Sequence, residues 1–465
     1  MTGRYKAYPE YKKPDIKFVN DIPTHWVISK VRHISAFGRG LAITKANLQD
    51  TGIPCVSYGE VHSKFGFEVD PKKHSLKCVS EEYLASSPYA LLSKGDFVFA
   101  DTSEDIDGSG NFTQLVSDET LFAGYHTVIV RPSPDNYYRF VAYLFDSPEF
   151  RTQVRDTVKG VKVFSVTQAI LKNASVWLPS FEEQQNIANF LDHETAKIDT
   201  LITKQEKLIE LLKEKRQAVI SHAVTKGLNP DAPMKDSGVE WLGKVPEHWE
   251  VMRLKHLIKS LESGCSVNAA DVPAKDNELG VLKTSCVYTR RFRASENKTV
   301  VVEELSRVKC AVRKGAIIIS RMNTPELVGA SALVDTKASN LFLPDRLWQT
   351  IFDERFEVNS EFLAHFMTVE GFRNQISLSA EGASSSMQNI AKEDYLSINV
   401  LLPKREEQTQ IVSYIKESEA KFLRLETKAL NAIQLMKERK TTLISAAVTG
   451  KIDVRDWAIL DKDQG

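Results

Sequence analysis

The most regular alternation of hydrophobic and polar positions in the chain runs from Leu178 to Val224. Apolar side chains recur there at alternating spacings of four and three residues, and no glycine or proline interrupts the run after Pro179. This is the heptad pattern of a helix that packs along one seam. A helix of about 43 residues would extend roughly 65 Å, longer than a small domain is wide, so its seam needs a partner. The apolar seam positions are Ile187, Leu191, Ile198, Leu201, Leu208, Leu212 and Val219.

The same pattern returns between Leu401 and Val448. Adding 224 to the residue numbers of the first run superimposes the two runs, so that Pro179 falls on Pro403 and Gln184 on Gln408. The second run therefore predicts the partner helix. Its large apolar seam positions are Ile411, Ile415, Phe422, Leu425, Met436 and Leu443.

The duplication extends beyond the two runs. The segment Asp21–Trp26, with the sequence DIPTHW, matches Lys244–Trp249, with the sequence KVPEHW, when 223 is added to each number. Phe140 matches Phe362 when 222 is added. A nearly constant offset indicates two copies of one unit of about 224 residues, which is far longer than a solenoid repeat.

The part of each copy that precedes the long run has the pattern of a mixed α/β domain, so we expect an α+β fold class. Short β-branched and aromatic runs bounded by turn residues predict strands. These runs are Ile53–Tyr58, Asp96–Ala100, Tyr125–Val130 and Val176–Leu178 in the first copy, and Val281–Lys283, Thr299–Val302, Ala316–Ser320, Leu347–Phe352 and Ile398–Leu402 in the second. Amphipathic stretches at Tyr138–Val154 and Ser360–Ser377 predict one helix near the end of each domain.

The order along the chain is domain, long helix, connector, domain, long helix. Residues 225–248 form the connector, which is rich in proline and glycine. If the two long helices pack antiparallel as a coiled coil, they separate the two domains and relate them by an approximate two-fold axis. The alternative is that each helix folds back on its own domain. We favour the antiparallel pair because a domain of this size offers too little surface to bury so long a helix.

Composition and charge exclude several classes of protein. The 61 basic and 61 acidic side chains cancel, so only local clusters can indicate a partner. The five cysteines are scattered and never spaced as C-x-x-C, which fits reduced thiols in a cytoplasmic protein better than disulfides or a zinc site. No apolar run has the length of a membrane span, so we expect no membrane partner.

No motif in the sequence predicts catalysis. Residues 238–245 have the glycine and lysine spacing of a phosphate-binding loop, but Val245 stands where a hydroxyl residue is needed. No histidine spacing indicates a metal hydrolase. Four acids crowd one loop, at Asp101, Glu104, Asp105 and Asp107, and we favour a solvated loop over a cation site.

Basic residues cluster locally, mainly in the second copy. Residues 281–321 contain ten basic side chains against three acidic ones. Arginine can bind phosphates or grip guanine, and asparagine can grip adenine, so the cluster is compatible with duplex DNA. A solvated basic face is the alternative. Equivalent loops of the two copies differ, as in Ala100–Ser103 and Ser320–Asn323, which would suit two reading heads for an asymmetric bipartite site.

The chain resembles the specificity subunits of Type I restriction-modification systems over essentially its whole length. The resemblance rests on Gly227–Val251, on the P-x-x-E-E-Q start of each long run at Pro179 and Pro403, and on the repeated close at Lys213–Thr225 and Lys437–Thr449. The first copy departs from the pattern before its DIPTHW motif, where the sequence YKKPDIKF replaces MKDSGVEW of the second copy.

The resemblance implies a non-catalytic DNA-recognition subunit. Two target recognition domains would each read half of a bipartite sequence in double-stranded DNA, and the coiled coil would set the unread gap. The expected partners are two methyltransferase (M) subunits and restriction (R) subunits. We expect no cofactor or metal in this chain, because S-adenosylmethionine, ATP and Mg would belong to the partners, which carry out adenine-N6 methylation and ATP-dependent cleavage. The expected boundaries are 1–177, 178–226, 227–401, 402–450 and 451–465, for domain, helix, connector with domain, helix and tail.

Loop positions are the candidates for DNA contact, because the family has no fixed base-reading residues. For the first domain they are Arg39, Lys45, Thr102, Ser103, Lys159 and Lys162. For the second they are Arg290, Arg291, Arg293, Arg321, Asn323, Ser384 and Ser385. Two other classes stay open at this point: a coiled-coil scaffold without DNA specificity, and an autonomous nuclease or methyltransferase.

Overall fold

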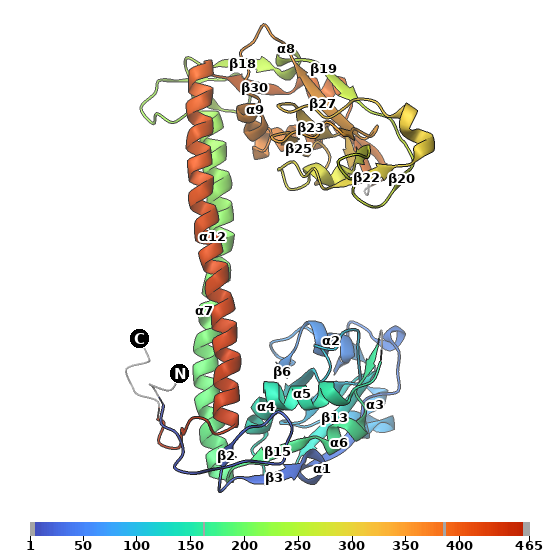
Figure 1. Cartoon of the computed structure of the whole chain (residues 1–465), viewed down its shortest axis with the longest axis vertical. Helices are drawn as coiled ribbons and strands as arrows, with labels where there is room; N and C mark the ends of the chain where they lie inside the picture. Colours follow the sequence, from blue (N-terminus) through green and yellow to red (C-terminus); the bar gives the residue numbers. More distant parts are fainter. Residues whose placement is uncertain (1–4, 161–162, 385–386, 459–465) are drawn as a thin grey trace. The chain divides into compact units, whose positions relative to one another are not determined.

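The structure is a computed structural model that describes residues 5–160, 163–384 and 387–458 (Figure 1). The chain divides into two compact units. The first unit comprises Met1–Gln205 and Asn431–Gly465, and the second comprises Glu206–Leu430. Each unit therefore holds one mixed domain together with part of each long helix. Within the described ranges, no helix combines the length and apolar character needed to cross a membrane.

The first unit is built on two mixed sheets. The larger sheet has, in spatial order, the strands β4 (Ser35–Arg39), β13 (Thr127–Pro132), β9 (Phe97–Ala100), β11 (Phe112–Leu115) and β6 (Phe67–Val69). The smaller has β7 (Cys78–Val79), β5 (Ile53–Val56), β12 (Leu121–Ala123) and β8 (Leu91–Leu92). One pair in each sheet is parallel, β11 with β6 and β12 with β5. The mixed α/β class predicted from the sequence is thus confirmed for this unit.

The second unit repeats this plan. One sheet has, in spatial order, β19 (Ile258–Ser263), β27 (Leu347–Phe352), β23 (Ile317–Ser320) and β25 (Ser331–Leu333). The other has β20 (Ala269–Ala270), β22 (Asn297–Val300), β21 (Gly280–Leu282) and β26 (Leu341–Phe342). All nine strand runs predicted from the sequence overlap strands of the two units.

In each domain, two helices occupy the stretch where the sequence predicted one. In the first unit the predicted helix Tyr138–Val154 is divided into α4 (Tyr138–Asp146) and α5 (Pro148–Thr157). Ser147 separates them, because its hydroxyl caps the first turn of α5 and Pro148 cannot continue the hydrogen bonds of α4. In the second unit the predicted helix Ser360–Ser377 is divided into α9 (Ser360–Phe366) and α10 (Glu370–Ser379).

Shorter elements complete both units. In the first unit they are β1 (Tyr11–Lys12), β2 (Ile22–Pro23), α1 (Val31–Ile34), η1 (Lys45–Asn47), α2 (Tyr58–Ser63), α3 (Glu82–Ser86), η2 (Pro88–Ala90), β10 (Thr102–Ser103), β14 (Phe164–Ser165) and α6 (Gln168–Asn173). In the second they are β16 (Met234–Asp236), β17 (Lys244–Pro246), α8 (Leu254–Leu257), η3 (Thr284–Val287), η4 (Val302–Arg307), β24 (Met322–Asn323), β28 (Glu381–Ser384), β29 (Met387–Asn389) and α11 (Lys392–Ser397).

An antiparallel ribbon leads into each long helix. In the first unit β3 (Val27–Lys30) pairs with β15 (Ser175–Leu178), and in the second β18 (Glu250–Arg253) pairs with β30 (Asn399–Leu402). The diverged leading segments also fold alike: β1 pairs with β2 and β16 with β17, both antiparallel. The copies therefore share this short strand pair before the His-Trp pair of each copy, although the sequences of the leading segments differ.

The two long helices are α7 (Phe181–Lys226) and α12 (Arg405–Val448). In the first unit the start of α7 and the end of α12 share one apolar core, and Lys440 pairs with Asp199 at 2.7 Å. In the second unit the end of α7 and the start of α12 share a core, and Lys213 lies 3.7 Å from Glu426. The helices are thus antiparallel within each unit (Figure 1), as predicted.

The seam differs from the predicted one in the middle of both helices. Ile187, Leu191, Ile198, Ile411, Ile415 and Leu443 are buried, and Leu212, Val219, Phe422 and Met436 are partly buried. Leu201, Leu208 and Leu425 are instead 49%, 42% and 47% exposed. Ile202, Ile209 and Glu426, each one residue further on, turn inward. A straight helix has about 3.6 residues per turn, so a strict seven-residue count drifts off the buried face.

Duplicated glutamines attach each long helix to its own domain. Gln184 accepts a hydrogen bond from the backbone nitrogen of Tyr137 at 2.8 Å, and Gln408 accepts one from that of Asn359 at 2.7 Å. Each glutamine also donates to the carbonyl of the proline five residues earlier, at 3.1 Å and 2.8 Å. These bonds explain what the glutamine of the repeated E-E-Q motif does in both copies: it joins the long helix to the domain.

The glutamate before each of these glutamines accepts hydrogen bonds from the H-W motif, the His-Trp pair that occurs in both copies at His25–Trp26 and His248–Trp249. Glu183 is buried, and its carboxylate accepts hydrogen bonds from the Tyr8 hydroxyl at 2.7 Å, the Trp26 indole at 3.0 Å and His25 at 2.9 Å. Burial, together with the bond to Glu183 and its charge, raises the pKa of Tyr8. In the second unit Glu407 is bonded by His248 at 2.8 Å.

An ion pair between domain and long helix is inverted between the copies. In the first unit Arg139 of α4 donates to Asp192 of α7 at 2.8 Å. In the second unit Lys416 of α12 lies 2.7 Å from Glu361 of α9. Adding 222 takes Arg139 to Glu361, and adding 224 takes Asp192 to Lys416. The contact is thus kept while the positive charge moves from domain to helix.

Candidate nucleic-acid interface

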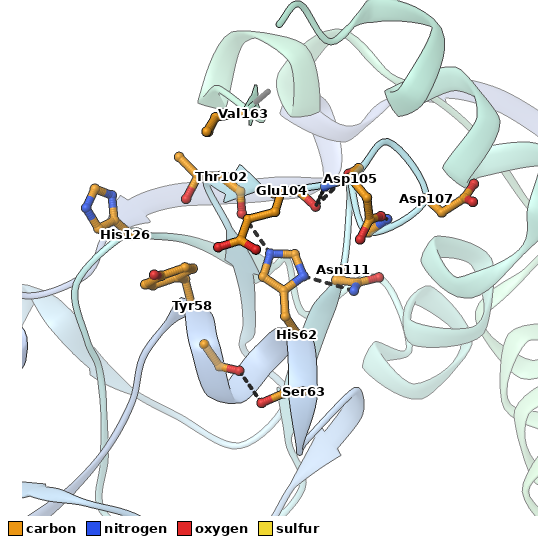
Figure 2. A pocket seen from close by; sticks show the side chains of 13 residues that line it. Tyr58, His62, Ser63, Thr102, Glu104, Asp105, Asp107, Asn111, His126 and Val163 are labelled. Carbon is orange, nitrogen blue, oxygen red and sulfur yellow. Dashed lines mark hydrogen bonds between the residues drawn. The ribbon is translucent and has the colours of Figure 1, made fainter. Parts of the chain in front are cut away.

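The loop 101–111 of the first unit borders a cavity of about 800 Å³ (Figure 2). The loop starts from the end of β9, a strand buried along its whole length, and returns into β11. Helix α2 supplies the other side, where His62 binds both ends of the loop. Its Nε2 lies 2.7 Å from the Thr102 carbonyl, and its Nδ1 lies 3.0 Å from the Asn111 amide nitrogen. The carbonyl can only accept, so Nε2 carries the proton and Nδ1 accepts from Asn111.

The predicted contact residues of the first unit lie in different settings. Arg39 and Lys45 are exposed, and the guanidinium of Arg39 stacks 5.6 Å from the ring centroid of Tyr89. Thr102 lines the cavity and is half-buried. Ser103 is buried and donates to the Asp105 carbonyl at 2.7 Å, so this placement does not favour its predicted contact with DNA. Lys159 is exposed, and Lys162 lies outside the described residues.

The equivalent loop of the second unit begins at Arg321. The Arg321 side chain is half-buried, and its Nε donates to the Asp345 carbonyl at 2.8 Å. This bond holds one edge of the guanidinium, and its two terminal nitrogens have no acceptor among the described residues. Asn323 is buried and donates to the Tyr288 hydroxyl at 2.7 Å, so it supports the loop from within. The contacts of Arg321 and Asn323 with DNA stay predictions, and Arg321 is the more exposed of the two.

The cluster at 290–293 is divided between different surroundings. Arg290 is exposed and has a positive φ of 60°, which is uncommon for a residue with a side chain. Arg291 lies 3.5 Å from Glu419 of α12, so it contacts the long helix of its own unit. Arg293 pairs with Glu296 at 3.5 Å and donates to the Ser285 carbonyl at 3.0 Å. Arg290 and Arg291 thus border one pocket next to Glu419, whereas Arg293 is held by Glu296 and Ser285.

Two predicted contact residues of the second unit, Ser384 and Ser385, have side chains that lie outside the described part of the structure. Ser384 ends β28, whose side chains are outside the description, and Ser385 lies outside the described residues. β28 pairs with β29, and β29 in turn pairs with β24 of the loop that begins at Arg321. Ser384 is thus on the same small sheet as that loop. Its contact with DNA stays a prediction.

Arg373, a buried arginine next to the second loop, was not among the residues predicted from the sequence. Arg373 is 9% exposed and donates to the Glu326 carbonyl at 3.2 Å, and it has no ion pair within the described ranges. Burial, reinforced by the charge of Arg290, lowers the pKa of Arg373 to about 10. The equivalent Arg151 pairs with Asp146 at 3.0 Å. With the offset of 222, Thr368 stands in the second copy where the first copy has Asp146. The second copy therefore lacks the acid that pairs with the arginine, and this difference is the signal that the sequence offered for Arg373.

Comparison with known proteins identifies relatives over the whole length. The family model described as Type I restriction modification DNA specificity domain matches twice, over residues 23–211 and 246–435. The Type I restriction enzyme EcoKI specificity subunit of Escherichia coli K12 is 22% identical over 454 residues, covering 95% of this chain and 92% of that protein. The MjaVIII specificity subunit of Methanocaldococcus jannaschii is 25% identical over 320 residues, covering 68% and 71%.

Among solved structures, the fold is similar to that of a chain from a type I R-M system studied for complex assembly and conformational transition. The TM-score is 0.66 at 14% identity, and the match covers 93% of this chain and 99% of that one. Each of the two family matches spans one copy of the duplication, from the H-W motif into the long helix.

Proposed function

The chain belongs to the family of Type I restriction modification DNA specificity proteins, and we propose that its two units read the two halves of one bipartite DNA target. The observation that carries this proposal is the double family match on a chain whose two copies share their framework and differ in their loops. A shared framework positions both loops alike, while different loop residues favour two unlike half-sites. The matches give no support to a scaffold without DNA specificity.

The long helices would keep the two half-sites a fixed distance apart. A continuous helix rises about 1.5 Å per residue, and its length is therefore fixed by its residue count. Both α7 and α12 are continuous, so they are suited to set the length of the unread gap. We propose the antiparallel coiled coil, with the domains related by an approximate two-fold axis, as the arrangement on DNA.

The chain would act without catalysing a reaction itself. Methyl transfer and cleavage would be carried out by modification and restriction subunits, which would bind S-adenosylmethionine, ATP and Mg. The relatives are named as specificity subunits of restriction enzymes, which supports a role inside such a complex. Because the chain contains two copies of one unit, we expect it to bind two modification subunits.

A binding experiment tests the proposed function. The full chain in complex with its modification subunits is titrated with a library of duplexes at several salt concentrations. We expect a preference for one bipartite sequence and a logarithmic affinity that falls linearly with the logarithm of salt concentration. The chain alone should show no turnover with S-adenosylmethionine or Mg²⁺. Binding without sequence preference would contradict the proposal, as would turnover by the isolated chain.

Replacing Arg321 by alanine should affect the second half-site alone. If its terminal nitrogens grip a guanine, the loss is about 1 to 3 kcal/mol at one base pair. Binding to single-position variants of the target measures this effect. Arg355→Ala is the matched control, because its guanidinium pairs with Asp353 at 2.7 Å on an exposed turn of the same unit. Equal weakening on all sequences would instead assign Arg321 to a phosphate.

A further inference from the structure

The cavity beside loop 101–111 presents hydrogen-bond acceptors and no lysine or arginine among its described lining residues (Figure 2). Glu104, Asp105 and Asp107 line it together with His62, His126, Asn111 and the ring of Tyr58. In a unit that binds DNA, such a lining repels phosphates, because carboxylates and phosphates carry the same charge. Its chemistry suits a base edge that carries N–H donors.

Three of the four loop acids already have partners. Asp101 lies 3.3 Å from His126, and Asp107 lies 3.7 Å from Arg155. The Asp105 carboxylate accepts a hydrogen bond from the backbone nitrogen of Gly108 at 2.5 Å, which closes a turn of the loop. Asp105 therefore holds the loop, and Asp101 and Asp107 each lie beside a basic side chain.

Glu104 differs from its neighbours. It is exposed, and its carboxylate has neither a hydrogen bond nor an ion pair with any residue that the structure describes. Figure 2 shows this carboxylate directed into the cavity. The two bonds of His62 to Thr102 and Asn111 fix the ends of the loop that carries it. Among the described residues, Glu104 is thus an unpaired acceptor on a held loop, and such preorganisation lowers the cost of binding.

We propose that Glu104 is a specificity-determining residue of the first half-site, its carboxylate accepting a hydrogen bond from the N4 amino group of a cytosine in the major groove. This inference rests on the proposed function. An ionised carboxylate can only accept. Cytosine presents the N4 amino donor in the major groove, whereas adenine places the acceptor N7 beside its amino group and guanine presents only acceptors.

The contrast with the second unit supports the assignment. The loop Asp101–Glu104 corresponds to Arg321–Thr324, so the first loop carries a carboxylate without a described partner where the second carries a partly bonded guanidinium. The first loop accepts and the second donates. The two half-sites should therefore present opposite hydrogen-bond polarity to equivalent loops.

The test compares Glu104→Gln with the wild-type chain, each in complex with its modification subunits. A duplex library randomised in both half-sites is selected for binding and sequenced. Asp107→Asn is the control, because it removes the same charge from the same loop at a residue that has a partner. The wild type should prefer cytosine about tenfold or more at one position of the first half-site. Glu104→Gln should reduce this preference to below about threefold and leave the second half-site unchanged.

Several results would overturn the inference. One is an unchanged base preference in Glu104→Gln, and another is an equal gain in affinity on all sequences, which would place Glu104 beside a phosphate. A lost preference for a base other than cytosine, or the same loss in Asp107→Asn, would also reject it. A wild-type complex that selects no sequence would instead reject the proposed function itself, so the two failures are distinguishable.

Discussion

Replacing Glu183 by alanine is expected to lower the free energy of unfolding of the first unit by about 3 kcal/mol. The substitution leaves the buried Tyr8 hydroxyl and Trp26 indole without the carboxylate that accepts their hydrogen bonds. An unpaired buried donor costs about 1 to 3 kcal/mol, and two such donors are created. The third donor, His25, is partly exposed and can turn to water.

Glu407→Ala is the matched control for this prediction. Glu407 accepts from the partly exposed His248, while the Trp249 indole nitrogen has no hydrogen-bond partner among the residues that the structure describes. Its loss should cost about 1 kcal/mol. Hydrogen exchange reports local opening, so it can measure the stability of the two units separately. Faster exchange near Trp26 in Glu183→Ala, without change in the second unit, is the expected result, and equal effects of the two variants would contradict it.

Replacing Asp192 by lysine should destabilise the first unit by about 3 kcal/mol or more. Arg139 is 15% exposed and pairs with both Asp192 and Glu68, and the Tyr143 hydroxyl donates to Asp192 at 2.7 Å. The variant removes an acceptor and brings an ammonium against a largely buried guanidinium. Chemical denaturation and hydrogen exchange of α4 measure the loss.

The second unit supplies the reverse experiment. Lys416→Asp brings a carboxylate towards Glu361, but the Lys416 side chain is 58% exposed, so the cost should be about 1 kcal/mol or less. The double variant Glu361→Lys with Lys416→Asp gives this pair the polarity of the first unit and should recover that loss. A wild-type stability for Asp192→Lys, or a double variant worse than the single one, would argue against the ion pairs as the cause.

Much of the fold could be predicted from the sequence because its main signals are periodic and duplicated. Two long amphipathic runs and a nearly constant offset were enough for the two helices and the two mixed domains. The short strands β6 and β12 were missed, and so were the longer β4 and β19, because β4 contains no β-branched residue and a register shift between Ile258 and Ser260 interrupts the alternation of β19. The break at Ser147 was missed because the apolar spacing continues across it, although Pro148 was a signal.

The candidate site was harder to predict because its residues are selected by three-dimensional neighbours. Ser103 and Asn323 had suitable chemistry, but the structure uses both inside their loops. Glu104 looked like one of four solvated acids, and only the partners of the other three separate it from them. The inverted ion pair was within reach, since aligning the copies places Arg139 on Glu361 and Asp192 on Lys416.

The inverted ion pair also limits which parts of such a duplicated chain can be recombined. A chimera that grafts the first domain onto the second long helix would set Arg139 against Lys416, and the reciprocal graft would set Glu361 against Asp192. Both junctions would bring like charges together. A domain can therefore be exchanged as a cassette between chains at its own position, whereas shuffling it to the other position requires a compensating charge change.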